Sequence, residues 1–343
     1  MKLIKPFRAL RPTRELASQV ASPPYDVVSR AEAKIIAQGN PYSFLHINKP
    51  DIDVDEDIDA YDHIVYQTGR ANLDEFMNSG ILVKDKIDSF YLYRQIMGDH
   101  EQIGVVAIAS LDAYESGSIK IHEFTRPDKE EDRVRHMMEL GAQVGPVFLT
   151  YSENHTLTDL MDKVAKGEPE YNFIDDSDVR HTFWLIQNPE LVTSIDNAFD
   201  EVECLYVADG HHRSAAASRA RHEYRRKNKQ HSGTESYNYF LVVIFPHSQM
   251  KILDYNRVLR DLNGMSVGDF MSAIQTNFYI EKLTSEDDAK PSKTLEYGLY
   301  LEKNWYKLNL KPEIISTINK DNPVNILDVS VLEKYLLSPI LGI

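Results

Sequence analysis

The stretch Cys204–Ala217 constrains the fold of this chain more than any other, because it combines the signals of a strand, a tight turn and a helix start. Leu205–Ala208 is short, apolar and partly β-branched, which predicts a buried strand. Asp209 and Gly210 end that strand, and glycine adopts backbone angles that other residues resist. The following residues, to about position 227, are rich in alanine and arginine, which favour helix. We therefore expect a strand, a turn and a helix that lies close against a sheet.

The predicted helix start is a candidate anion site. Its free N–H groups and the helix dipole favour negative charge by about 0.3–1 kcal/mol when exposed and up to about 2 kcal/mol when partly buried. His211, His212 and Arg213 add donors, and Asp209 adds a carboxylate that can hold a metal ion. A simpler interpretation is that Asp209 is a helix N-cap and the histidines are surface residues. Two histidines, an arginine and an acid on one turn after an apolar strand favour the functional interpretation.

Charge and cysteine content limit the classes of partner. The 343 residues include 38 basic and 53 acidic side chains, a formal net charge of −15. This charge argues against a nucleic acid or an anionic membrane as the main partner, although it permits a local basic pocket. The single cysteine, Cys204, allows no intramolecular disulfide and is expected to be a small buried hydrophobe. The longest apolar run, Phe240–Phe245, is too short to span a membrane, and no signal peptide is evident, so we expect a soluble cytoplasmic protein.

The order of predicted elements indicates the fold class. Strands and helices alternate irregularly, with hairpins among them, which favours a mixed α/β or α+β fold over a regular doubly wound one. We expect a mixed sheet with flanking helices. Gly264 is a candidate boundary between a main ligand-binding domain at residues 1–263 and a smaller C-terminal region at residues 264–343.

Local signals predict several particular elements. Two prolines make Ser22–Val28 a rigid loop. A capping box begins a helix at Ser29 that ends near Gln38. Asn40–Ile47 is expected to be a turn that leads into a strand. Pro127 suits the first turn of a helix that stops at Gly141.

His122 and Glu123 form a second candidate cluster, at the end of a predicted strand. A buried glutamate near cations can act as a general base or as a metal ligand. The alternative is a strand-end ion pair of Glu123 with Lys120 or Arg126. A second histidine at helical spacing is missing, so the pair is not a zinc-protease motif.

Arg133 is a further candidate for anion binding, because a guanidinium can hold a phosphate or carboxylate with two hydrogen bonds. The alternative is a bridge to Glu130 on the same predicted helix. The sequence contains no Gly-x-Gly-x-x-Gly, no Walker loop and no Gly-x-Ser-x-Gly, so the dinucleotide-fold, P-loop and hydrolase-elbow interpretations have no support.

The order of several motifs resembles a large, mostly bacterial family filed as domain of unknown function 1015. The matching segments span nearly the whole chain: Ser22–Val27, Asn40–His46, Ile121–Thr125 with Asp132-Arg133, Gly145–Phe148, Ala208–Arg213 and Leu327–Leu332. The family name implies no established activity. Family members continue into a further tail, whereas this sequence stops in the apolar stretch 339–343, so we expect that it is truncated.

The strand–turn–helix around Asp209 also resembles, more loosely, the phosphate-binding element of the ParB/sulfiredoxin-like fold, which includes free-serine kinases. That resemblance implies a ParB-like core, a phosphate on the helix N-terminus and magnesium held by the aspartate, with a separate glutamate as base. Asp209, Gly210, His211 and Arg213 match the motif by position, and Glu123 as the base is our inference. Sulfiredoxin chemistry needs a cysteine in this turn, and none occurs here.

From these observations we expect a nucleotide- or phosphate-binding enzyme that transfers phosphate to a small hydroxyl compound, with Mg and ATP or ADP as cofactors. Catalytic roles fall to Glu123, Asp209 and His122, with Asp209 also the metal ligand. Binding of the phosphorylated ligand falls to Gly210, His211, His212, Arg213 and Arg133. Two alternatives stay open. One is a metal-dependent hydrolase or isomerase that uses His122, Glu123, His211 and His212, and the other is a non-catalytic sensor of a small ligand. The substrate and the oligomeric state are not specified by the sequence.

Overall fold

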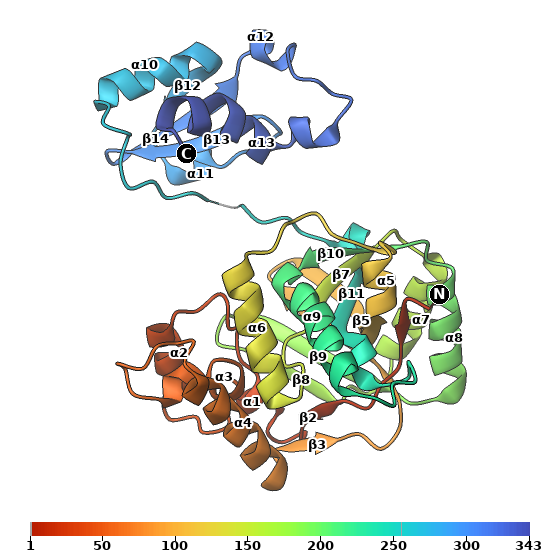
Figure 1. Cartoon of the computed structure of the whole chain (residues 1–343). Coiled ribbons are helices and arrows are strands. Elements are labelled where there is room, and N and C mark those ends of the chain that lie inside the picture. Colours follow the sequence, from red (N-terminus) through yellow and green to blue (C-terminus); the bar gives the residue numbers. More distant parts are fainter. Residues whose placement is uncertain (1, 255) are drawn as a thin grey trace. The chain divides into compact units, whose positions relative to one another are not determined.

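The chain folds as two compact units, Met1–Ile252 and Leu253–Ile343, in a computed structural model that describes residues 2–254 and 256–343 (Figure 1). The sequence analysis places the boundary after residue 263 instead. The described residues between these two boundaries form no helix or strand. The two divisions therefore differ only in the unit to which this connecting segment is assigned.

The first unit is built on a nine-stranded mixed sheet. Eight strands follow one another in the order β6-β10-β7-β11-β5-β4-β9-β8, and β1 pairs with β5. A separate pair, β2 with β3, lies off this sheet. The bounds of the strands are β1 (Ile4–Lys5), β2 (Leu10–Pro12), β3 (Leu82–Lys84), β4 (Phe90–Met97), β5 (His100–Ser110), β6 (Ile119–Lys120), β7 (Val147–Tyr151), β8 (Tyr171–Ile174), β9 (Val179–Ile186), β10 (Leu205–Asp209) and β11 (Tyr239–Pro246).

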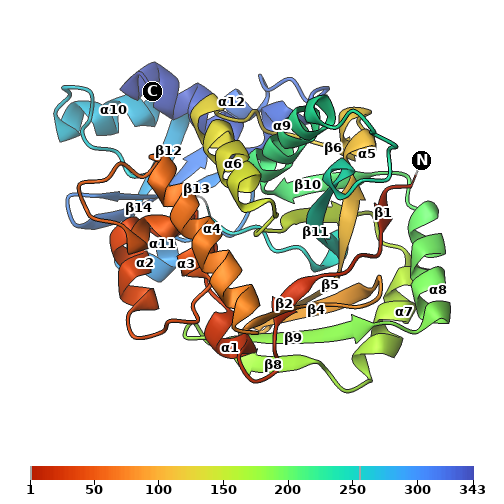
Figure 2. The same cartoon turned by 60° about the horizontal axis from the view of Figure 1, so that its bottom comes forward.

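Strand direction in this sheet determines where functional residues can gather. β6 is parallel to β10, and β7 is parallel to β11, whereas the other neighbours are antiparallel. Figure 2 shows β4, β9 and β8 side by side at one end of the sheet. Because parallel neighbours end at the same edge, the residues that follow β6 and β10 are brought together.

Helices cover this sheet, as the mixed fold class predicts, and that prediction is confirmed. The main apolar core lies between the sheet and residues of α5, α7, α8 and α9. The bounds of the helices are α1 (Ala17–Val20), α2 (Arg30–Ala37), α3 (Leu45–Asn48), α4 (His63–Asn78), α5 (Leu111–Glu115), α6 (Pro127–Leu140), α7 (His155–Ala165), α8 (Pro189–Asp200) and α9 (His211–Lys227), with short 3₁₀ turns η1 (Pro50–Asp53), η2 (Ser236–Asn238) and η3 (His247–Gln249). Within the described residues, no helix is long and apolar enough to cross a membrane.

Several local predictions are confirmed by the helix ends. Ser29 caps α2 through a complete capping box with Glu32. α6 begins at Pro127 and ends at Gly141, whose φ of 64° is the left-handed conformation that glycine adopts most easily. Residues 21–28 form no helix or strand, as two consecutive prolines predict.

The prediction of a strand within Asn40–Ile47 is wrong. The Asn40 side chain accepts from the Tyr42 N–H and forms a turn, and α3 then begins at Leu45. Leu45 and Ile47 are both fully buried, in two different clusters. The alternation of apolar residues in this segment therefore does not indicate a strand. Tertiary contacts with two clusters stabilise a short helical turn there instead.

The second unit is a small three-stranded antiparallel sheet, in the order β12-β14-β13, with its own apolar core. Helices pack on this sheet, and the core includes Phe270, Phe278 and Leu337. The bounds of its elements are α10 (Val267–Asn277), β12 (Phe278–Leu283), α11 (Glu286–Ala289), β13 (Glu296–Leu301), β14 (Asn304–Leu310), α12 (Pro312–Ile315), η4 (Pro323–Ile326), α13 (Asp328–Leu332) and the π-helix η5 (Glu333–Leu341).

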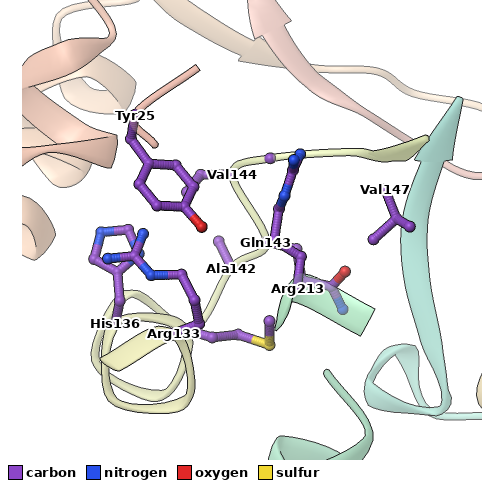
Figure 3. A pocket seen from close by; sticks show the side chains of 10 residues that line it. Tyr25, Arg133, His136, Ala142, Gln143, Val144, Val147 and Arg213 are labelled. Atoms are coloured by element: carbon purple, nitrogen blue, oxygen red, sulfur yellow. The ribbon is translucent and has the colours of Figure 1, made fainter. Parts of the chain in front are cut away.

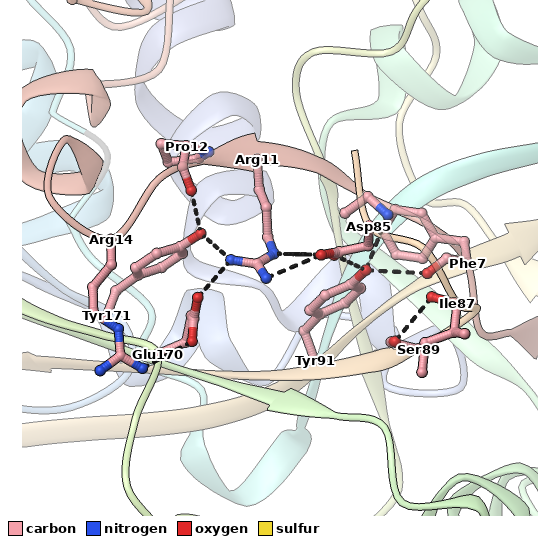
Figure 4. A network of polar contacts seen from close by, with 11 residues as sticks. Phe7, Arg11, Pro12, Arg14, Asp85, Ile87, Ser89, Tyr91, Glu170 and Tyr171 are labelled. Carbon is pink, nitrogen blue, oxygen red and sulfur yellow. Dashed lines mark hydrogen bonds and ion pairs between the residues drawn. The ribbon is translucent and has the colours of Figure 1, made fainter. Parts of the chain in front are cut away.

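A polar network attaches the β2–β3 pair to the edge of the large sheet (Figure 4). Arg11, on β2, binds the Asp85 carboxylate at 3.0 Å and Glu170 at 2.9 Å, and it also donates to the Tyr171 hydroxyl. The Tyr91 hydroxyl donates to Asp85 at 2.7 Å. One largely buried guanidinium thus balances two carboxylates from separate segments.

We predict that Arg11→Gln lowers the free energy of unfolding of the first unit by about 3 kcal/mol, because it leaves the buried Asp85 carboxylate without a cation. Urea denaturation followed by circular dichroism measures this change. Arg8→Gln is the matched control, since Arg8 and Asp88 form an exposed pair at 3.4 Å, and it should cost less than about 0.5 kcal/mol. Equal effects of the two substitutions would contradict the structural role of Arg11.

Candidate functional site

The start of α9 is shaped by Gly210. This residue is the N-cap and has a φ of 94°, so the predicted glycine turn is present. A Cβ at this position would lie 3.2 Å from Arg213 Nε and 3.3 Å from the Val147 Cα. Asp209 does not cap the helix, because no side chain caps α9. The Asp209 carboxylate instead accepts from Arg213 Nη2 at 2.8 Å.

The first turn of α9 retains free backbone donors. Within the described part of the chain, no acceptor bonds the N–H groups of His211, His212 or Arg213, and the first bonded amide is that of Ser214, which donates to the Gly210 carbonyl at 3.0 Å. Free N–H groups at this position are the general feature of helices that bind anions.

His211 joins the two clusters that the sequence analysis proposed separately. Its side chain is 4% exposed, and its Nδ1 lies 3.5 Å from Glu123 Oε2. The ring of His122 contacts it edge-on, with 4.5 Å between ring centroids. Burial first, and then the neighbouring His122, lower the pKa of His211. His211 Nε2 is buried without a hydrogen-bond partner in the described residues, which is unusual for a native polar group.

The segment that carries Glu123 is held against α9 by a backbone contact. The Arg126 N–H donates to His212 Nε2 at 3.1 Å. Glu123 does not form the strand-end ion pair considered as an alternative, since Arg126 pairs with Asp128 and Lys120 lies over the Tyr206 ring. The pairing of β6 with β10 therefore brings His122 and Glu123 to the helix start.

A small cavity opens beside this cluster, between two arginines (Figure 3). Arg133 comes from α6 and Arg213 from α9, and their side chains are 14% and 15% exposed. The cavity volume is about 30 Å³, enough for one or two water molecules. The lining residues are Tyr25, Arg133, His136, Met137, Ala142, Gln143, Val144, Gly145, Val147 and Arg213. We call this space the two-arginine cavity.

Each arginine of the cavity already has carboxylate partners. Arg133 Nε donates to Asp132 at 2.9 Å, not to Glu130 as the alternative supposed. Arg213 donates to Asp209 and to the Pro146 carbonyl, and it lies 3.6 Å from the Asp26 carboxylate. These contacts fix both guanidinium groups in position.

Tyr25 and His136 are cavity residues that the sequence analysis did not identify. The Tyr25 ring centroid lies 4.0 Å from the Arg133 guanidinium carbon, a cation–π contact. Burial raises the pKa of Tyr25, and Arg133 opposes that effect. His136 is buried, and its Nε2–H donates to the Ile47 carbonyl at 2.9 Å. The sequence marks this segment as a proline-stiffened loop and as a family motif, and the aromatic and the acid on that loop are the signal that could have placed Tyr25 at the site.

All the predicted site residues lie in one region. His122, Glu123, Asp209, His211 and His212 surround the start of α9. Gly210, Arg213 and Arg133 then connect this cluster to the two-arginine cavity. The roles assigned to these residues are not tested by their positions and remain predictions.

The metal predictions have limited geometric support. Among residues 2–254 and 256–343, no group of three or more His, Cys, Asp or Glu side chains is placed to hold a metal ion. A magnesium site needs fewer protein ligands, because the ion is commonly bound by one or two carboxylates together with substrate phosphates. The exposed Asp209 carboxylate suits that arrangement.

A second hollow, of about 430 Å³, lies between α4, α6 and the end of α9. Its lining residues are Tyr61, His63, Tyr66, Arg135, Met138, Glu139 and Lys227. It contains none of the predicted site residues. The Tyr66 hydroxyl nevertheless donates to Asp132 at 2.9 Å. One lining residue of this hollow therefore contacts the carboxylate that pairs with Arg133.

Comparison with known proteins identifies one family. A family model described as "Protein of unknown function (DUF1015)" matches residues 4–330. Neither curated proteins nor solved structures gave a match. The resemblance to the ParB/sulfiredoxin-like fold is therefore not shown and stays a prediction.

We predict that His136 makes the protein less stable in mild acid. Burial, and next the charge of Arg133, lower the pKa of His136 from 6.5 to about 4. Between these values the unfolded chain binds a proton that the folded chain does not, so stability rises with pH across this window and is lost as pH falls from 6.5 towards 4. The loss is up to about 1.4 kcal/mol per pH unit.

The comparison of wild type with His136→Gln isolates this contribution, because glutamine can still donate to the Ile47 carbonyl but does not titrate. Urea denaturation at pH 6.5 and 5.0 should show that the wild type loses about 1.5 kcal/mol more than the variant. An equal loss in both proteins would show that His136 is not held neutral.

Proposed function

This chain belongs to the DUF1015 family, and from that premise we propose that it binds the phosphate group of a nucleotide or another phosphorylated small molecule at the two-arginine cavity. We further propose that it transfers phosphate to a small hydroxyl compound, as a small-molecule kinase does. The family description assigns no activity, so the proposal depends on the geometry of the site.

One observation carries the proposal: Arg133 and Arg213, two largely buried guanidinium groups from different helices, line the same cavity. Arginine binds phosphate with two parallel hydrogen bonds, and its charge persists at any physiological pH. The free N–H groups in the first turn of α9, the helix that carries Arg213, add further hydrogen-bond donors. Such fixed donors stabilise the negative charge of a transferring phosphoryl group.

The size of the cavity limits what it can hold. About 30 Å³ is too small for a nucleoside, so only the oxyanion end of a ligand can enter, after a small adjustment of the wall. The remainder of the ligand then lies outside the cavity. This limit favours recognition of the phosphate over recognition of the base or sugar.

Magnesium with ATP or ADP fits the residues present. Bound magnesium would neutralise phosphate charge during transfer. Asp209 is the residue we assign to hold the cation, since its carboxylate is exposed beside Arg213. Arg133 and Arg213 hold the phosphate oxygens, and the free N–H groups of His211 and His212 lie at the same helix start.

Glu123 is the residue we assign to accept a proton from the substrate hydroxyl. Its carboxylate is exposed and lies 3.5 Å from His211 Nδ1, so it is oriented by a neighbour and is accessible to a substrate. His122 packs against His211 and keeps that ring in place. We also propose a small-molecule substrate and a cytoplasmic location, and we assign no nucleic acid partner.

We predict that magnesium with ATP or ADP raises the melting temperature of the chain by a few degrees. A ligand at about one hundred times its Kd stabilises the folded state by about 2.7 kcal/mol. Thermal shift measurements with ATP, ADP, CTP and inorganic phosphate, each with magnesium, test this. Arg213→Gln should remove most of the shift, because one of the two phosphate-binding guanidinium groups is lost.

Arg226→Gln is the control for this experiment. Arg226 lies on the same helix and also pairs with a carboxylate, that of Glu223, but it is exposed and distant in sequence from the helix start. It should leave the shift unchanged. The proposal fails if none of the four ligands stabilises the wild-type chain.

We predict that Glu123→Gln slows phosphate transfer by about 10²–10⁴-fold, because loss of a general base typically has this effect. ATP hydrolysis or transfer to a panel of small hydroxyl compounds, followed by product detection, provides the rate. The same variant should still show the thermal shift, since Glu123 is not assigned to phosphate binding. Ligand binding with no turnover in the wild type would favour the sensor alternative instead.

A further inference from the structure

The loop Ser22–Val27 lines the two-arginine cavity through Tyr25, and its own hydrogen bonds are local. Within residues 22–27 the Val27 N–H donates to the Pro24 carbonyl at 3.3 Å, and the Ser22 hydroxyl donates to the Pro23 carbonyl at 3.4 Å. Val27 is exposed. Neither of these hydrogen bonds joins the loop to the sheet.

Two side chains of the loop contact the arginines of the cavity. The Tyr25 ring lies 4.0 Å from the Arg133 guanidinium, and the Asp26 carboxylate lies 3.6 Å from Arg213. These are the groups to which the phosphate is assigned above. Loop attachment and ligand binding therefore use the same cations.

We propose that Ser22–Val27 is an autoinhibitory latch, in which Tyr25 and Asp26 occupy Arg133 and Arg213 until a phosphate-bearing ligand displaces them. This inference rests on the proposed function, because it assumes that the ligand binds these two arginines. In this scheme the loop regulates access to the site, because it is closed when the cavity lacks a phosphate and opens as a phosphate enters.

The balance of charge at the cavity supports the latch. Two guanidinium groups face three carboxylates, those of Asp26, Asp132 and Asp209. With the loop closed, an entering anion thus meets a net negative charge. Release of Asp26 removes one negative charge and leaves the two arginines balanced by Asp132 and Asp209.

The volume of the cavity also supports the latch. Tyr25 is one of the lining residues, and with its ring in place the volume is about 30 Å³, room for one or two waters. A phosphate group is larger than this space. Displacement of Tyr25 widens the cavity from the side on which the loop lies (Figure 3).

The first arm of the test needs no ligand. Chymotrypsin cleaves the bond after Tyr25 when that ring leaves the cavity, so the rate at which the fragments of this one cleavage form, followed by mass spectrometry, reports the open fraction. Asp26→Asn should raise this rate about fivefold, the effect of losing one partly exposed ion pair. Each rate is divided by that of a synthetic peptide of residues 18–32 with the same sequence, which removes any effect of the substitution on cleavage itself.

Asp74→Asn is the matched control. Asp74 is 44% exposed and pairs with Arg70, whereas Asp26 is 43% exposed and pairs with Arg213. The two carboxylates thus have the same kind of partner and the same exposure, but Asp74 lies outside the loop. Its substitution should leave cleavage at Tyr25 unchanged.

The second arm uses inorganic phosphate with the wild-type chain and with Asp26→Asn. Titration calorimetry should give about fivefold tighter binding to the variant, because phosphate no longer competes with the carboxylate. Saturating phosphate should also accelerate cleavage of the wild type at Tyr25.

The two arms separate failure of the latch from failure of the proposed function. Unchanged cleavage in Asp26→Asn, or phosphate binding with equal affinity to both proteins, overturns the latch and leaves the anion site standing. Increased cleavage without any phosphate binding supports attachment of the loop through Asp26 and overturns the phosphate site.

Discussion

The pairing of β6 with β10 is the constraint on which the candidate site depends. Leu205 lies opposite Ile119 and Tyr206 opposite Lys120, in parallel. This register makes both strands end at the same edge of the sheet, so the segment after Lys120 and the start of α9 become neighbours. An antiparallel pair would send His122 and Glu123 to the opposite edge, away from His211. The site thus arises from strand direction, whereas its side chains supply only the chemistry.

Burial of two arginines imposes the next constraint, because a buried charge is costly unless it is paired. Arg133 and Arg213 meet this condition with carboxylates of Asp132, Asp209 and Asp26. A cavity lined by two such guanidinium groups therefore also contains the acids that balance their charge. The resulting competition between internal carboxylates and an external anion is a physical consequence of holding guanidinium groups in a partly dry space.

Much of the local structure was predictable from sequence because its signals are local. Gly210, the Ser29 capping box and the helix from Pro127 to Gly141 follow from backbone chemistry within a few residues. The strand expected within residues 40–47 was wrong because burial in two separate clusters decided its conformation. For the site, the sequence singled out residues that the structure brings into one region, but it did not predict the contact of Tyr25 with Arg133, which joins segments more than one hundred positions apart. Periodicity contains no information about such contacts.

The two-arginine cavity brings together residues from four of the six motifs on which the family resemblance rests. Tyr25 and Asp26 come from the first motif, Arg133 from the third, Gly145 and Pro146 from the fourth, and Arg213 from the fifth. Arg133 lies inside α6, whereas the other five residues lie in loops and turns or in the first turn of α9. Residues far apart in the sequence therefore meet at one small polar space, because β10 pairs with β7 and α6 packs against α9.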